Sequence, residues 1–267
     1  NMSRITFPLA VLLAVVVLGV NLTSGAAAPP DPAAVDKALE TLKTYDWGQD
    51  RSSLQALDDA VAATHGDAAA RKALETHLVA ALKTDAPRAA KDVVCRHLSL
   101  IGSADAVPAL AELLTNSELS QMGRYALERI PDPAALAALR EALPKTDGVL
   151  KVGVINSLGV RRDADSTPLL AALLDNPDQQ IAAAAIAALG AIGSADAAKA
   201  LSDVQKKATG QLQGGVADAR LCCAERLLAA GQKLEAMAIY KALNSEDQPK
   251  HVRLAAVRGL LAATGKQ

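Results

Sequence analysis

The histidines are the side chains best suited to hold a metal ion, and their spacing does not form a site. His65, His77, His97 and His251 stand far apart, and none lies three or four residues from another. A metal site needs several converging ligands, and the helical HExxH motif supplies two of them one turn apart. We therefore predict no metal and no other cofactor, and we expect these histidines on the surface or in a groove.

Nucleophilic catalysis is not indicated either. No GxSxG motif occurs, and a serine or cysteine nucleophile needs a base and an oxyanion hole nearby. Asp58 and Asp59 are adjacent on an expected helix, so they point in different directions and are read as solvated charges. Cys95, Cys222 and Cys223 lack metal-binding spacing and are expected to be small buried residues. We predict no catalytic residue in this chain, leaving open a catalytic domain in a longer parent protein.

Binding chemistry is better represented, by a column of polar residues at one repeat position. Arg96, Tyr125 and Asn156 each stand two residues before a leucine that recurs along the chain. Equivalent positions of stacked helices lie roughly 10 Å apart, so the three side chains form a strip. Arginine and tyrosine are enriched in binding surfaces, and this favours a contact site. The alternative is an ordinary solvated face of the outer helix layer.

Three arginines occupy unusual positions in the middle of the chain. Arg161 stands where neighbouring repeats carry isoleucine, Arg124 stands where they carry Cys or Ile, and Arg162 follows directly. A buried guanidinium without a partner is costly, so Arg161 must reach solvent or a carboxylate such as Asp163. Together the three predict a cationic patch suited to an acidic partner. Structural ion pairs are the alternative.

The composition predicts helices and argues against a nucleic-acid surface. The chain is 51% hydrophobic but only 2% aromatic, and alanine, the strongest helix former, dominates it. Close helix packing suits such small side chains, whereas a sheet core would need alternating β-branched and aromatic residues. The 28 basic and 29 acidic residues nearly cancel. Nucleic-acid binding would need clustered basic residues and stacking aromatics, so we exclude it.

Two leucine columns reveal an internal repeat. Successive members of each column are separated by 29, 31 and 31 residues. A period near thirty indicates stacked helical hairpins, which bury a continuous core only together. The first column, which marks the first helix of each unit, is Leu98, Leu127, Leu158 and Leu189, and the second is Leu110, Leu139, Leu170 and Leu201.

The turns of the repeat carry recognisable capping residues. Gly102 and Gly193 suit the left-handed end of a first helix, and Asp132 before Pro133 suits the start of a second one. We therefore predict an all-α, right-handed α-solenoid of HEAT-like hairpins over residues 54–267, in about six units. The glycine-rich residues 208–215 are expected to form a flexible loop or a break in curvature. Residues 28–53 are expected to be a leader and a capping helix, in which Trp47 either closes the core or is an exposed contact residue.

The N-terminus predicts export. Arg4 precedes an uncharged apolar run over residues 5–20, and small residues follow at 26–28. This order is typical of a secretory signal peptide, here residues 1–27, and places the mature protein in the periplasm or outside the cell. The run is shorter than the roughly 20 residues that span a bilayer. An uncleaved anchor is the alternative, and we expect no stable membrane span after cleavage.

The repeat resembles a known family. Residues 186–197 and 251–260 are similar to HEAT-like repeats of the phycobilin-lyase type, and the resemblance covers about residues 88–267. Segments such as CRHLSLIGSADAVPAL and VGVINSLGVRRDAD also look like exported HEAT-repeat proteins of environmental bacteria. In that family the array often lies next to a 3-keto-disaccharide hydrolase-like domain, of which nothing is visible here. The resemblance implies the fold, and the lyase activity does not carry over.

The function most consistent with the sequence is a non-catalytic, exported protein-interaction scaffold with an unknown protein partner. The alternative is an accessory module or subunit of a carbohydrate-active or lyase-type enzyme that binds a glycan or small molecule in a groove. A deep pocket with converging polar groups would favour that alternative. A purely structural spacer would show no localised patch. Residues 248–267 supply only the first helix of a unit, so we expect the array to be the front part of a longer protein, unless this helix caps the stack.

Overall fold

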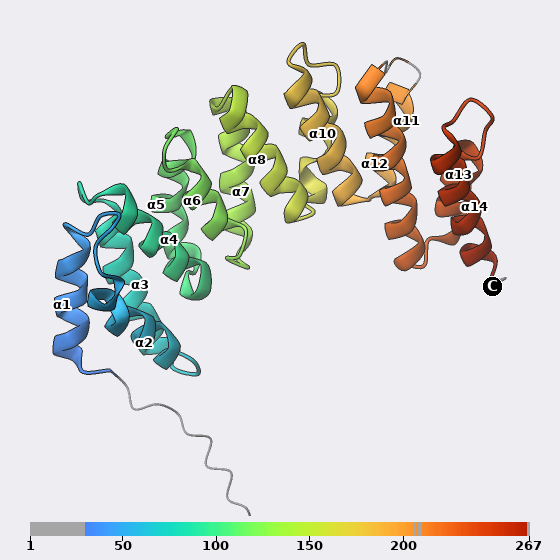
Figure 1. Ribbon diagram of the computed structural model, residues 1–267. Coiled ribbons are helices and arrows are strands. Elements are labelled where there is room, and N and C mark those ends of the chain that lie inside the picture. Colours follow the sequence, from blue (N-terminus) through green and yellow to red (C-terminus); the bar gives the residue numbers. More distant parts are fainter. Residues whose placement is uncertain (1–29, 206, 208–209, 266–267) are drawn as a thin grey trace, which may run out of the picture.

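The structure, a computed structural model, describes residues 30–205, 207 and 210–265 and is helical throughout these residues, without a strand. Figure 1 shows the helices following one another in a curved row, as in an α-solenoid. Within the described residues, no helix has the length and apolar character needed to cross a bilayer. The α-helices are α1 (Pro32–Leu42), α2 (Gln55–Ala63), α3 (Ala68–Leu82), α4 (Arg88–Ile101), α5 (Val107–Glu112), α6 (Ser120–Leu127), α7 (Pro133–Ala142), α8 (Gly148–Val160), α9 (Thr167–Ala171), α10 (Gln179–Ile192), α11 (Ala195–Gln205), α12 (Gly210–Ala229), α13 (Lys233–Leu243) and α14 (Lys250–Thr264).

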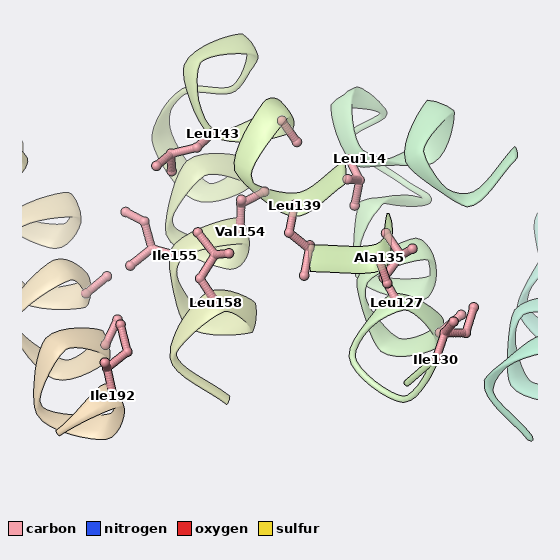
Figure 2. Close-up of a cluster of buried hydrophobic side chains, with 14 of the residues drawn as sticks. Leu114, Leu127, Ile130, Ala135, Leu139, Leu143, Val154, Ile155, Leu158 and Ile192 are labelled. Carbon is pink, nitrogen blue, oxygen red and sulfur yellow. The ribbon is translucent and has the colours of Figure 1, made fainter. Parts of the chain in front are cut away.

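The two leucine columns lie in the centre of the hydrophobic core, and this continuous core confirms the predicted solenoid. All eight leucines are fully buried, and they belong to one continuous apolar cluster that runs through the array. Figure 2 shows this packing in the middle of the chain, where Leu127, Leu139 and Leu158 lie within one cluster. Each such side chain contributes about 1.5–3 kcal/mol through burial, so the repeated leucines are the main reason why the hairpins stack.

Neighbouring first helices approach each other closely at two glycines. A Cβ atom placed on Gly159 of α8 would lie 2.9 Å from the Cα of Ala188 in α10. One placed on Gly190 of α10 would lie 2.8 Å from the Cα of Ala219 in α12. Both glycines directly follow a column leucine. They let the backbones of successive units pack against each other without an intervening side chain.

The predicted caps hold in part. Asp132 accepts a hydrogen bond from the Ala134 amide at 2.8 Å, and Gly193 ends α10 with φ of 68°, both as expected. The left-handed conformation predicted for Gly102 is wrong, because its φ is −63° and its ψ 146°. The next residue explains the difference. The Ser103 amide and hydroxyl donate to the Glu75 carboxylate at 2.6 and 2.8 Å, which holds the chain extended at this turn.

For two irregular regions the structure excludes one of the two alternatives that the sequence left open. Residues 210–215 are not a loop, because α12 begins at Gly210 and continues for 20 residues, while residues 208–209 lie outside the described part. Trp47 does not close the core: it is 63% exposed, and Tyr45 packs into the apolar cluster instead. The predicted signal peptide, residues 1–27, also lies outside the described residues.

Candidate interaction surface

The predicted polar column lies on the exposed side of the first helices. Arg96 of α4, Tyr125 of α6 and Asn156 of α8 are all solvent-exposed. The guanidinium carbon of Arg96 lies 6.0 Å from the centre of the Tyr125 ring, so these two members are neighbours across the unit boundary. The Nε of Arg96 also donates to Asp92 at 3.0 Å, and this hydrogen bond is the main cause that raises the pKa of Arg96. Arg96 is therefore held in place as a cation beside the ring.

A second arginine covers the Tyr125 ring. The guanidinium carbon of Arg129 lies 3.7 Å from the ring centre, and its NH1 donates to the Tyr125 carbonyl at 2.9 Å. Cation–π contacts at exposed sites contribute about 0.5–1 kcal/mol each. Arg129 was not among the residues predicted from the sequence, although its position two residues after the column leucine Leu127 was the available signal. Tyr125 is thus positioned on the surface by two cations.

Two exposed apolar side chains share the repeat position of Arg129. Leu100 of α4 is 69% exposed and Val160 of α8 is 65% exposed. Single exposed apolar residues are common, but these two flank the arginine-bound Tyr125 on consecutive first helices. Below, the name mid-array strip refers to Arg96, Leu100, Tyr125, Arg129, Asn156 and Val160.

Arg124 points into the boundary between two units. Its guanidinium takes the space that a Cβ on Gly153 would fill, with its Cζ 2.7 Å from that position. Its NH1 donates to the Gly153 carbonyl at 3.2 Å and to the Ser157 hydroxyl at 3.4 Å. Ser157 in turn donates to Glu128 at 2.6 Å. Burial lowers the pKa of Arg124, as expected for a cation held between α6 and α8 rather than in solvent.

Arg161 also makes internal contacts, and its partners are backbone carbonyls instead of a carboxylate such as Asp163. Its NH1 donates to the carbonyls of Leu127 at 3.1 Å and Glu128 at 3.3 Å, and also to that of Ile130. These carbonyls lie at the C-terminal end of α6 and in the turn that follows it, where backbone acceptors lack helical partners. Arg161 therefore caps the preceding unit, and it forms no ion pair with a carboxylate of the described residues.

The carboxylate expected for Arg161 has another partner, and Arg162 has a backbone role. Asp163 is buried and accepts from Arg140 at 2.7 and 2.9 Å. Arg162 has a left-handed φ of 51° and, with Asp163, closes α8 by two backbone hydrogen bonds to Gly159 and Leu158. Of the three arginines predicted to form a cationic patch, only Arg162 is exposed.

The remaining titratable groups do not converge on a metal site. Among the described residues, no three histidines, cysteines or carboxylates come together to hold a metal ion. His97 is buried, in contrast to the surface or groove position expected for it. Its Nε2 lies 2.8 Å from the Oδ1 of Asp58, so Asp58 is not a free solvated charge either. Cys95 and Cys223 are buried as expected, whereas Cys222 is exposed.

A wide groove runs between α10 and α12. It has a volume of about 910 Å³ and is open to solvent. Its walls are mainly small or apolar residues such as Ala183 and Leu212, and its polar groups are Gln179, Gln180 and Asp218. A glycan or small-molecule site would instead enclose its ligand and present several converging polar groups.

Comparison with known proteins agrees with the repeat architecture. Residues 144–219 match the family of HEAT repeats. Together with the stacked hairpins, this match supports a HEAT-like repeat architecture over residues 144–219. A crystal structure of an engineered protein is 21% identical, covers 88% of this chain and 69% of its own, and has a TM-score of 0.43, too low to carry an argument. A search of the curated proteins found no match.

Proposed function

We propose that this chain is an exported, non-catalytic scaffold whose mid-array strip binds a partner protein. HEAT repeats generally serve as protein-interaction scaffolds, which agrees with the repeat match over residues 144–219. The observation that carries the proposal is the arrangement of Tyr125 between Arg96 and Arg129 on an exposed helix layer. Tyrosine and arginine are the side chains that most often dominate interface energies.

The strip also indicates the chemistry of the partner surface. Leu100 and Val160 offer apolar area on either side of Tyr125, and the two guanidinium groups offer fixed donors. A matching surface would place an apolar side chain against each of these two residues and a carboxylate beside Arg129. Charge complementarity of this kind speeds association and excludes partners with basic surfaces.

Affinity capture with matched variants tests this proposal. The bait is residues 28–267, which contain the whole described fold, presented to the envelope fraction of the source cells. A Leu100→Ser/Tyr125→Ala double variant removes the centre of the strip without touching the core. We expect one partner to be retained by the unmodified bait and lost from this variant.

The control carries the same kind of change elsewhere. A Leu169→Ser/Leu234→Ser variant removes exposed apolar side chains from α9 and α13, which are second helices. It is expected to retain the partner. Loss from both variants, or retention by both, would refute the strip as the binding surface. Arg124 and Arg161 are unsuitable for this test, because both bind the neighbouring unit.

Export is proposed from the N-terminal pattern alone. Arg4, the apolar run at 5–20 and the small residues at 26–28 form the signal. Expression of the full chain in a Gram-negative host, followed by fractionation and intact-mass measurement, tests it. We expect a periplasmic product that begins at Ala28. A cytoplasmic product that keeps its first residues would refute export.

A further inference from the structure

A groove on the layer of second helices contains a buried charge. It lies between α11 and α13, with α12 at its base, towards the C-terminal end of the array (Figure 1). Its volume is about 410 Å³, and it is open to solvent. Alanines and two larger apolar residues, Leu227 and Ile239, form most of its lining. Its charged groups are Lys199, Asp203, Arg220 and Glu235.

Arg220 of α12 is the buried member of this charged set. It is 7% exposed, whereas the other three charged residues are exposed to solvent. When the column leucine Leu189 of α10 is aligned with Leu227 of α12, Arg220 takes the position of Ala182, which is fully buried. Helix α12 therefore places a guanidinium group where the preceding unit has only a methyl group.

Arg220 has no carboxylate partner among the described residues. The residues outside the described part contain no aspartate or glutamate. The NH1 of Arg220 donates to the neutral side chain of Gln205, and its Nε is buried without a hydrogen-bond partner in the described residues. Burial lowers the pKa of Arg220, but arginine stays charged at physiological pH. A buried cation without a counter-charge is costly, so an anion beside this guanidinium would be stabilising.

The residues beside Arg220 favour a carboxylate that carries an apolar chain. Lys199 and Ser202 are three residues apart on one face of α11, and both line the groove. Their ammonium and hydroxyl groups are further hydrogen-bond donors to an anion. The remaining walls, alanines with Leu227 and Ile239, are apolar and suit a short hydrocarbon chain. Phosphate or sulfate would leave these walls uncovered.

The two carboxylates that also line the groove do not prevent an anion from binding. Asp203 and Glu235 are exposed, so water already solvates and screens their charges. Neither of them forms an ion pair with Arg220. The buried charge therefore decides which ligand the groove favours.

We propose that the groove between α11 and α13 binds a carboxylate-bearing ligand with a short apolar chain, and that the carboxylate pairs with Arg220. Hydrogen bonds from a guanidinium to a carboxylate are among the strong ones in proteins, because both partners are charged. The groove between α10 and α12 lacks this feature, since its charged group is the exposed Asp218. The site lies on second helices and does not depend on the mid-array strip.

Saturation-transfer NMR with residues 28–267 tests this proposal. The probe is 4-methylpentanoate, which carries one carboxylate on a short apolar chain. Its neutral control, 4-methylpentanamide, has nearly the same shape. We expect saturable binding of the acid that added salt weakens, and at least tenfold weaker binding of the amide, because the amide cannot make the charged hydrogen bond. Absence of binding by the acid, or equal binding of acid and amide, would overturn the proposal.

Variants locate the site. Arg220→Met removes the charge, keeps much of the side-chain length, and is expected to abolish binding. Ala238→Leu puts a larger side chain into the groove from an exposed position of α13, and is expected to weaken binding at least tenfold. Arg258→Met makes the first change at an exposed arginine of α14 and is expected to leave the affinity unchanged. An unchanged affinity of either groove variant would contradict the assignment.

Urea unfolding followed by circular dichroism separates binding from folding. Arg220→Met removes a buried charge that lacks a counter-charge, so its midpoint is expected to be unchanged or higher. The acid should raise the midpoint of the unmodified chain and not that of Arg220→Met, because only a bound ligand stabilises the folded state. If Arg220→Met does not fold, the affinity of Ala238→Leu decides the question.

Two competitors identify the source of the carboxylate. Inorganic phosphate at the concentration of the acid is expected to displace little of it, and complete displacement would overturn the assignment to a carboxylate. An acetylated, amidated tripeptide with glutamate between two alanines carries its one carboxylate on a side chain. Displacement of the acid by this peptide would assign the carboxylate to a protein segment. Binding of the acid without such displacement would assign it to a free small acid, and both results support the site.

Discussion

Substitution of Gly190 by alanine is expected to destabilise the array, although the same change usually stabilises a helix. Alanine is favoured over glycine in a helix interior by about 0.5–1 kcal/mol. At Gly190 the new Cβ would lie 2.8 Å from the Cα of Ala219 and 2.9 Å from its Cβ. Carbon atoms in good contact are about 3.5–4.0 Å apart, so α10 and α12 must separate by several tenths of an ångström or more. Overpacking of this kind costs about 1–3 kcal/mol, which outweighs the gain in helix propensity.

The same protein offers a matched control for this substitution. Gly214 is also helical, in α12, but a Cβ placed there meets no atom within 4 Å. Gly214→Ala is therefore expected to raise stability by up to about 1 kcal/mol, while Gly190→Ala lowers it by about 1–2 kcal/mol. Urea unfolding followed by circular dichroism gives the midpoints, and the slopes show whether the transition stays cooperative. A Gly190→Ala chain as stable as the unmodified one would refute the close packing of these helices.

Three further predictions follow from single residues. Arg140→Ala leaves the buried Asp163 carboxylate without its main partner and is expected to cost up to about 3 kcal/mol in urea unfolding; an unchanged midpoint would contradict the ion pair. Burial raises the pKa of Cys95 and of Cys223 to about 12, and it also raises the pKa of the exposed Cys222. Ellman's reagent should therefore react with one thiol, Cys222, in the native state, faster as the pH rises, and with three thiols in denaturant. More than one fast-reacting thiol in the native state would refute this. Trp47 fluorescence should be red-shifted and readily quenched by acrylamide in the folded protein, and a blue-shifted, protected emission would place its ring in the core instead.

The helical solenoid could be predicted because its main determinant is local and repeated. The column leucines recur every 29 or 31 residues, and each lies where a helical hairpin must bury one side. Asp132 and Gly193 were predictable for the same reason, because a capping residue acts on the backbone next to it. Such features depend little on what other units contribute.

The errors concern contacts between units. Gly102 was expected to be left-handed, but Glu75 from the preceding unit binds the next residue and holds the turn extended. For Arg161 the expected alternatives were solvent or a nearby carboxylate, but its guanidinium donates to carbonyls about 31–34 residues earlier in the chain. A repeat alignment fixes which position a residue holds. It does not show which partner the adjacent unit provides there.

The exposed position of the polar column could be predicted from the sequence, whereas its role as a binding surface stays a prediction. Arg96, Tyr125 and Asn156 could be placed on one strip from their shared repeat position. Arg129 was missed, because the sequence does not show that its guanidinium folds back over the Tyr125 ring. For Trp47 the sequence left open whether the ring closes the core or is exposed; the ring is exposed, and nearby Tyr45 packs into the core.

Photo-crosslinking from the strip tests the central claim most directly. A photoreactive amino acid replaces Leu100 in one variant and Val160 in another, with Leu169 and Leu234 as control positions on second helices. Each variant is irradiated with the envelope fraction, and the covalent products are identified by mass spectrometry. We predict that the two strip positions give an adduct with one shared protein and that the control positions do not give it. Adducts with that protein from the control positions alone would place the partner on the other helix layer and contradict the account.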